Sequence, residues 1–223
     1  MSIIFDYPAC PAETGPSPAC DNPVMSDDAI RCRPATAADA PAIARLHAKS
    51  WRRAYRGMMG DAYLDGDIDG ERSRFWSGFF AAPPPKACVI IAVAGRRLAG
   101  FASVYGDHDS DWGTRIENLH VDLDFGRRGV GATLMAEAAR WCAREGFGGP
   151  VHLGVLQPNT PAIRFYERLG GRRVLELVWT SPDGNRVPEY RMAWESPTVL
   201  LANASRRMTK PHDETPTDSP ARP

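Results

Sequence analysis

The run from Gly126 to Gly131, GRRGVG, constrains this chain more than any other segment, because it stands between a strand pattern and a helix pattern. From Gly129 to Glu145, small or apolar residues recur at intervals of four, four and three, as an amphipathic helix requires. Glycine lets a backbone approach a ligand closely, and the free N–H groups of a helix's first turn bind anions. The GxxGxG spacing is neither a Walker loop nor a dinucleotide fingerprint, so by itself this turn is more often a solvated connection than a phosphate site.

Composition places the chain among globular proteins and narrows the function classes. Of the 223 residues 43% are hydrophobic, and 27 Lys and Arg balance 27 Asp and Glu, so no basic field favours nucleic acid. The longest apolar run, Ala87 to Ala94, is too short for a membrane-spanning helix. Residues 1–29 contain no Lys or Arg and do not resemble a secretory signal, so we expect a cytoplasmic protein. Five scattered cysteines without a CxxC pair indicate neither a disulfide framework nor a metal site.

The chain is predicted to hold one α/β domain, residues 29–196, between two disordered segments, residues 1–28 and 197–223, whose composition is polar and rich in proline. The apolar positions near residue 118 move from even, at Ile116, to odd, at Leu119 and Val121, and this phase change predicts a β-bulge. Strands are expected at 30–33, 88–93, 98–105, 116–121, 151–156, 173–180 and 186–194, and helices at about 37–54, 71–80, 129–145 and 160–169.

Three segments together resemble the GNAT superfamily of acetyl-CoA-dependent N-acyltransferases. They are Ile116–Asp122 (IENLHVD), the turn from Asp124 to Gly131, and Asn159–Gly170 (NTPAIRFYERLG), in the family's order and spacing. The resemblance covers residues 30–194 and implies a mixed, mostly antiparallel twisted sheet flanked by helices. Gly126 departs from the family pattern, which usually opens this loop with Gln or Arg, and the backbone-amide cradle is expected to survive that change.

By that resemblance acetyl-CoA is the cosubstrate, and no metal is implied. The amides of Arg127 to Gly131 would bind the pyrophosphate, and the backbone of Leu119 and Val121 would align the pantetheine and polarise the thioester carbonyl. Asn159 would contact the cofactor arm. The cofactor-binding residues that the resemblance implies are Leu119, His120, Val121, Gly126, Arg127, Arg128, Gly129, Val130, Gly131, Asn159, Ala162 and Tyr166.

Acetyl transfer to an amine needs an acid and a base, because the amine must lose a proton and the departing thiolate must be stabilised or protonated. Glu117 resembles the family's frequent base, acting through water. Its alternative role is a structural ion pair with Arg115. Tyr166 is the candidate acid, and its alternative role is a packed core tyrosine with a satisfied hydroxyl. His120 is a weaker candidate base, since a lone strand histidine is more often packed than catalytic.

The acceptor side is less well determined by the sequence. Trp51 and Tyr55 fall in the segment after the first helix, which by the resemblance commonly walls the acceptor side. They are candidate substrate contacts together with Glu117, although their spacing of four suits core packing equally well. An acidic loop from Asp107 to Asp111, before Trp112, could attract an ammonium group, and a merely solvated loop is its more common explanation.

These observations predict an N-acetyltransferase that moves an acetyl group directly from acetyl-CoA to the primary amine of a small or amino-acid-like molecule. Two alternatives stay open. The acceptor could be a protein or peptide amine, which would require an open groove, or the chain could be a catalytically idle acetyl-CoA-binding module. No nucleic acid or membrane partner is expected, and a homodimer is left open.

Overall fold

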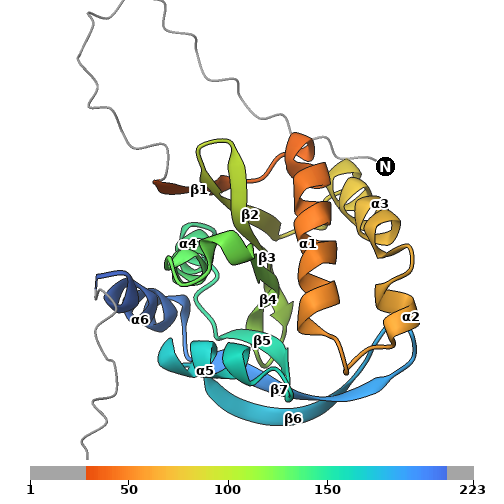
Figure 1. Cartoon of the computed structure of the whole chain (residues 1–223). Coiled ribbons are helices and arrows are strands. Elements are labelled where there is room, and N and C mark those ends of the chain that lie inside the picture. Colours follow the sequence, from red (N-terminus) through yellow and green to blue (C-terminus); the bar gives the residue numbers. More distant parts are fainter. Residues whose placement is uncertain (1–28, 210–223) are drawn as a thin grey trace, which may run out of the picture.

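The computed structural model describes residues 29–209, so the predicted disorder of residues 1–28 and 210–223 lies outside the described residues. The described chain forms one seven-stranded sheet with helices on both faces (Figure 1). The strands are β1 (Ile30–Pro34), β2 (Ala87–Ala94), β3 (Arg97–Asp109), β4 (Gly113–Val121), β5 (Val151–Leu156), β6 (Arg172–Thr180) and β7 (Arg186–Trp194). The helices are α1 (Ala40–Ala54), α2 (Asp61–Leu64), α3 (Ile68–Ala81), α4 (Val130–Arg144), α5 (Thr160–Arg168) and α6 (Pro197–Thr209), with 3-10 turns at Ala37–Asp39 and Leu123–Phe125. The predicted α/β class with a mostly antiparallel sheet is confirmed.

The sheet has the order β1-β2-β3-β4-β5-β7-β6, and every neighbouring pair is antiparallel except β4 and β5. The parallel pair is short, since it joins only Thr114 to Val151 and Arg115 to His152. The antiparallel pairs on either side are much longer. The sheet therefore consists of two halves that are joined along a short seam.

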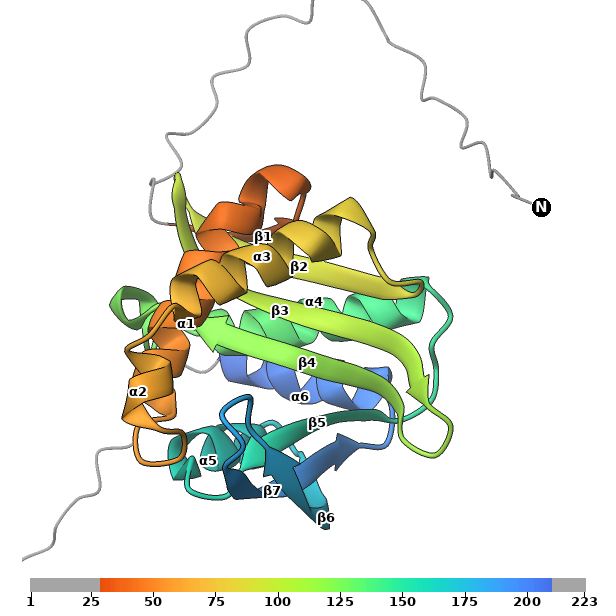
Figure 2. The same cartoon turned by 90° about the vertical axis from the view of Figure 1, so that its right-hand side faces the viewer.

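Two layers of helices bury the two faces of the sheet. In Figures 1 and 2, α1 and α3 lie on one face, and α4 and α6 lie on the other. Strand β2 shows how the sequence supports both layers, because Ile90 and Ala92 join the core beneath α4 while Val89 and Ile91 pack with α1 and α3. A strand buried on both faces has a continuous apolar sequence, and ACVIIAVA has that form.

The predicted β-bulge is confirmed in β4. Ser103 of β3 pairs with Asn118, and the next residue, Val104, pairs with Ile116, so the register passes over Glu117. An extra residue in one strand changes which face the following side chains occupy. This explains why Ile116 and Leu119 both contact the core beneath α4 although an odd number of positions separates them.

The C-terminal boundary of the predicted domain is wrong, because residues 197–209 of the segment expected to be disordered form the helix α6. Leu200 and Ala204 are fully buried in the main core. Their spacing of four places both on one helical face, and Ser196 Oγ accepts a hydrogen bond from the Val199 amide at 3.3 Å at the start of the helix. Because a polar sequence follows this short apolar stretch, the sequence pattern does not reveal the helix. The short helix α2 was not predicted either.

The burial of α6 predicts a measurable contribution to stability. Leu200→Ala should lower the free energy of unfolding by about 2 to 5 kcal/mol, as expected for truncating a buried leucine. Val199→Ala is the matched control, because Val199 is 37% exposed and Leu200 is 0% exposed. It should change stability by less than about 0.5 kcal/mol. Urea denaturation measures both, and equal effects would contradict the docking of α6 on the core.

Candidate active site

A cavity of about 1760 Å³ lies where β4 and β5 separate. Its walls come from the ends of α1 and α6, the starts of α4 and α5, and strands β4 to β7. Beyond Arg115 and His152, the described parts of β4 and β5 form no further pairs. The facing backbone edges of the two strands are therefore available to an extended ligand.

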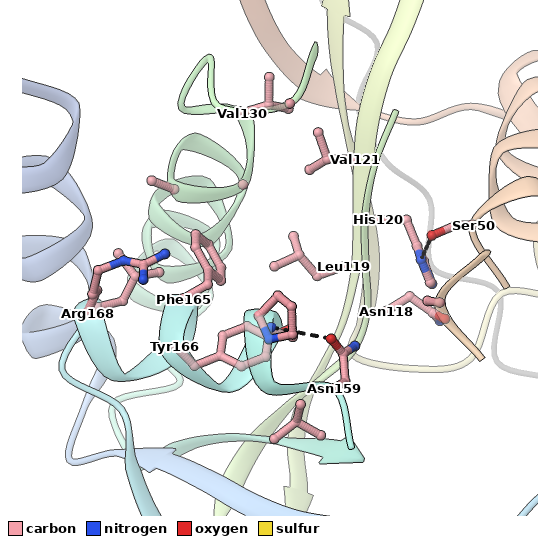
Figure 3. A pocket seen from close by; sticks show the side chains of 18 of the residues that line it. Ser50, Asn118, Leu119, His120, Val121, Val130, Asn159, Phe165, Tyr166 and Arg168 are labelled. Carbon is pink, nitrogen blue, oxygen red and sulfur yellow. Dashed lines mark hydrogen bonds between the residues drawn. The ribbon is translucent and has the colours of Figure 1, made fainter. Parts of the chain in front are cut away.

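Side chains of β4 alternate between the two sides of the sheet next to this cavity. Figure 3 shows Leu119 and Val121 directed toward α4 and α5, and His120 directed the other way, toward Ser50. Leu119 and Val121 are partly buried against the main core, and both line the cavity. The structure thus brings these two residues to the place that the sequence predicts for the acyl and pantetheine arm.

The glycine turn forms the wall at the start of α4. Gly129 is the N-cap residue and has φ +79, a conformation that favours glycine. The first-turn amides that follow it have no helical acceptor and are available to an anion. A Cβ on Gly131 would lie 3.1 Å from Phe165 Cζ, so the α4–α5 contact also requires a small residue there. The predicted loop residues Gly126, Arg127, Arg128 and Val130 line the same wall.

The first turn of α5 contributes residues with structural as well as lining roles. Asn159 Oδ1 accepts a hydrogen bond from the Ala162 amide at 3.3 Å and so caps α5. Asn159 and Ala162 both line the cavity. Asn159 therefore caps α5, and the predicted cofactor contact would add to this role.

Tyr166 lies on α5 at the boundary between the cavity and the core. Its ring packs 5.2 Å from the Phe165 ring and 6.2 Å from the Trp194 ring, measured between centroids. Burial raises the pKa of Tyr166 above its usual value, with a smaller contribution from Tyr55. The hydroxyl therefore stays protonated at neutral pH and can donate a proton or a hydrogen bond. Tyr166 therefore packs in the core and also lines the cavity.

His120 does not present its side chain to the cofactor side of β4. Its Nδ1 lies 2.8 Å from Ser50 Oγ, and its ring stacks 4.6 Å from the His47 ring. Burial, together with the charge of Arg72, lowers the pKa of His120 to about 4. The imidazole is therefore neutral at pH 7, and only the backbone of His120 is placed to contact the cofactor.

Glu117, the bulged residue, lines the cavity and is 39% exposed at its side chain. Its carboxylate is ion-paired with Arg115 on the same strand, so the structural alternative is realised. The negative charge of Glu117 nevertheless reaches the acceptor side, where it contributes to raising the pKa of Tyr55 and of Tyr105, both of which are raised mainly by burial. Glu117 is therefore paired with Arg115 and lines the cavity at the same time.

Glu189 of β7 is a lining residue that sequence reasoning missed. No hydrogen bond or ion pair to its carboxylate is present in the part of the chain that the structure describes, and the carboxylate lies directly over Gly154 of β5. Burial and the nearby charge of Glu117 raise the pKa of Glu189, although Arg115 and Arg191 oppose that shift. No local motif marks this residue, because it reaches the cavity only through the pairing of β7 with β5.

Aromatic rings form the wall beside these carboxylates. The centroids of Trp51 and Tyr55 are 5.4 Å apart, and Trp179 of β6 lies 6.4 Å from Trp51 and 6.3 Å from Tyr55. All three line the cavity, and they also belong to a small core between α1 and the start of α3. The Arg72 guanidinium covers one face of the Trp51 ring at 4.5 Å. Trp51 and Tyr55 therefore pack in this core and also line the cavity, and Trp179 is a lining residue that the sequence did not predict.

The acidic loop from Asp107 to Asp111 does not contribute to the cavity, because none of its residues is part of the lining. Its carboxylates have local partners instead. Asp107 pairs with Lys86 at 2.9 Å, and Asp109 pairs with Arg191 at 3.4 Å and accepts from the amides of Asp111 and Trp112. The hypothesis that this loop attracts the amine is corrected: the solvated, internally paired loop is what the structure contains.

The turn between β6 and β7 is joined to the segment before α2. Asp183 Oδ2, in this turn, accepts a hydrogen bond from the Gly60 amide at 2.6 Å, just before α2. In Figure 1, β6 and β7 run along the lower edge of the molecule toward α2. Because this contact spans more than a hundred residues of sequence, it is invisible to local patterns.

No group of three or more His, Cys, Asp or Glu side chains in residues 29–209 is placed to hold a metal ion. Over the same span, every helix is too short or too polar to cross a bilayer. Burial raises the pKa of the Cys142 thiol to about 11, so this buried cysteine is a poor nucleophile.

Two curated relatives share part or most of this sequence. An uncharacterized N-acetyltransferase, YuaI, of Bacillus subtilis (strain 168) is 26% identical over 182 residues, covering 79% of this chain and 99% of that protein. Streptothricin acetyltransferase of Streptomyces lavendulae is 35% identical over 108 residues, covering 48% of this chain and 52% of that protein.

A solved structure shares the fold. PaiA N-acetyltransferase from Thermoplasma acidophilum, determined in complex with coenzyme A, superposes with a TM-score of 0.56 at 18% identity, covering 72% of this chain and 98% of that one. The family model described as the acetyltransferase (GNAT) family matches residues 43–171, more than half of the chain. This chain therefore belongs to the acetyltransferase (GNAT) family.

Proposed function

We propose that this protein transfers the acetyl group of acetyl-CoA directly to the primary amine of a small cationic molecule. The observation that carries the proposal is the lining of one part of the cavity, which holds Glu117, Glu189 and three aromatic rings. Carboxylates and aromatic faces are the groups that bind an ammonium ion in a partly desolvated site.

The alternatives have less support. A protein or peptide amine calls for an open groove, whereas the β6–β7 turn, which follows the lining residue Trp179, is hydrogen-bonded to the residue before α2 and so holds this part of the wall in place. Glu117 and Tyr166 place a carboxylate and a protonated tyrosine on the same cavity. A catalytically idle binding module would not need these two groups. A small acceptor also agrees with one relative, which is named for streptothricin.

The residues of the cavity fit the cosubstrate. The first-turn amides of α4 and the backbone edge of Leu119 and Val121 would hold its diphosphate and its extended arm, in the order that an elongated molecule requires. When bound, acetyl-CoA supplies an activated acetyl thioester. The open backbone edge of β4 would accept hydrogen bonds from the arm as a neighbouring strand does.

The chain's own side chains would then move two protons. Glu189 would hold the ammonium group, and Glu117 would accept a proton from it through water, so that the amine lone pair is free to attack the acetyl carbon. The new C–N bond forms as the C–S bond breaks. The Tyr166 hydroxyl would donate its proton to the departing thiolate sulfur, and the proton that the nitrogen must still lose to become an amide would return through water to the Tyr166 oxygen. No covalent bond to the enzyme is made.

The glycine turn predicts the loss of cosubstrate binding when a side chain enters it. Gly129→Val should weaken coenzyme A binding by at least about tenfold, or about 1.4 kcal/mol, in calorimetry. Gly146→Val at the other end of α4 is the control, because Gly146 has a matching φ of +80 and lies outside the cavity. It should carry the same backbone strain and keep its affinity. An unchanged affinity in Gly129→Val would remove the turn from the site.

The two catalytic proposals are separable. Glu117→Gln should keep cosubstrate affinity and lower turnover by roughly 10² to 10⁴, with a flattened acidic limb of the pH profile. Tyr166→Phe keeps the buried ring and therefore the melting temperature, but should slow turnover by removing the hydroxyl. Single-turnover rates, which exclude product release, are the measurement. Wild-type rates at every pH would reduce Glu117 to an ion-pair partner and Tyr166 to a packing residue.

Glu189 predicts a specific effect on the amine. Glu189→Gln should raise the KM for a cationic amine about tenfold while leaving that for acetyl-CoA unchanged, because only the amine carries the complementary charge. Because the pKa of Glu189 is raised, its side chain becomes protonated and loses its negative charge at a higher pH than usual. As the pH falls through that range, the KM for the amine should rise in wild type but not in Glu189→Gln. Asp111→Asn, in the acidic loop outside the cavity, is the control. Equal KM values in both variants would exclude Glu189 from the acceptor site.

A further inference from the structure

Helix α6 brings two arginines to the end of the cavity opposite the carboxylates. Arg206 and Arg207 line the cavity together with Arg168 of α5 and with Arg127 and Arg128 of the glycine turn. The carboxylate that lines this end, Glu167, is engaged by Arg173 at 2.6 Å. This end of the cavity is therefore strongly cationic.

The end of α6 is held in place by contacts with the cosubstrate-binding helices. Thr133 Oγ1, in the first turns of α4, lies 3.3 Å from Met208 Sδ. Asn203 packs over Gly170 at the end of α5 and accepts a hydrogen bond from Arg206. One turn earlier, Leu200 is buried in the main core. The arginines of α6 therefore extend from a fixed backbone.

Two of the guanidinium groups have no anion of their own. Neither Arg168 nor Arg207 has a hydrogen bond or an ion pair among residues 29–209, and both line the cavity. Figure 3 shows Arg168 between α5 and α6, on the side of the cavity away from His120. Like charges gathered without counterions repel one another, and an anionic ligand between them removes that cost.

The number of cationic groups exceeds what one diphosphate needs. The α4 amides with Arg127 and Arg128 already provide a diphosphate site. A separate phosphomonoester carries a charge of about −1.5 to −2 and three acceptor oxygens, and guanidinium groups bind it in a bidentate manner. Coenzyme A has such a group on its ribose.

We propose that Arg207 of α6 and Arg168 of α5, supported by Arg206, bind the 3′-phosphate of coenzyme A. Helix α6 lies beyond residues 43–171, which the family model matches, whereas Arg168 lies within them. The proposal rests on the cosubstrate and not on the identity of the amine. By this proposal, α6 allows the protein to distinguish coenzyme A from 3′-dephospho-coenzyme A.

Calorimetry with these two ligands on the full chain tests the proposal without any acceptor. Wild type should bind coenzyme A at least about tenfold more tightly than 3′-dephospho-coenzyme A. Arg207→Gln and Arg168→Gln should each reduce that ratio, and the double variant should bring it close to one, while affinity for 3′-dephospho-coenzyme A stays the same. Arg45→Gln, an exposed arginine on α1 across the sheet, makes the same charge change and should keep the wild-type ratio.

The outcomes distinguish this proposal from the proposed function. Equal wild-type affinities for the two ligands, or a ratio that the variants leave unchanged, would overturn the role of α6 alone. If neither ligand binds, the cosubstrate site itself is contradicted along with it. Because both arginine side chains are outside the core, melting temperatures should remain at the wild-type value, and a lowered melting temperature with an unchanged ratio would assign the arginines to stability instead.

Discussion

The separation of β4 from β5 after two paired positions is the constraint on which the rest of this structure depends. A sheet that stayed paired there would use its backbone hydrogen-bonding groups internally and leave no space for a ligand. Because the strands part, the groups along Leu119 and Val121 are left for an extended molecule to satisfy, much as an added strand would. The single parallel contact in an otherwise antiparallel sheet thus creates the cavity, and the helices on either side only finish its walls.

Opposite charges at the two ends give the cavity a direction. Arginines gather where α4, α5 and α6 meet, while Glu117 and Glu189 lie at the acceptor end. An anionic cosubstrate and a cationic acceptor would be drawn to different ends and would meet near the bulge of β4. The bulge contributes directly, because it lets Ile116 and Leu119 share the core while Glu117 between them faces the cavity.

Elements after the family-matched region complete the site. The β6–β7 turn is joined to the segment before α2 through Asp183 and Gly60, and α6 is joined to the start of α4 through the contact of Met208 with Thr133. Both contacts join segments distant in sequence. The positions of α6 and of the β6–β7 turn therefore depend on tertiary contacts.

Local patterns in the sequence by themselves determined the order of strands and helices, the glycine turn and the bulge at Glu117, since periodicity and glycine conformation act over a few residues. They also led to the family. Tertiary structure alone decided that Glu189 joins the cavity, that the side chain of His120 faces α1, and that the acidic loop near Asp109 stays outside. It also decided that Leu200 anchors a C-terminal helix. Each of these depends on which distant strand or helix lies next to the residue, and residue spacing carries no information about that neighbour.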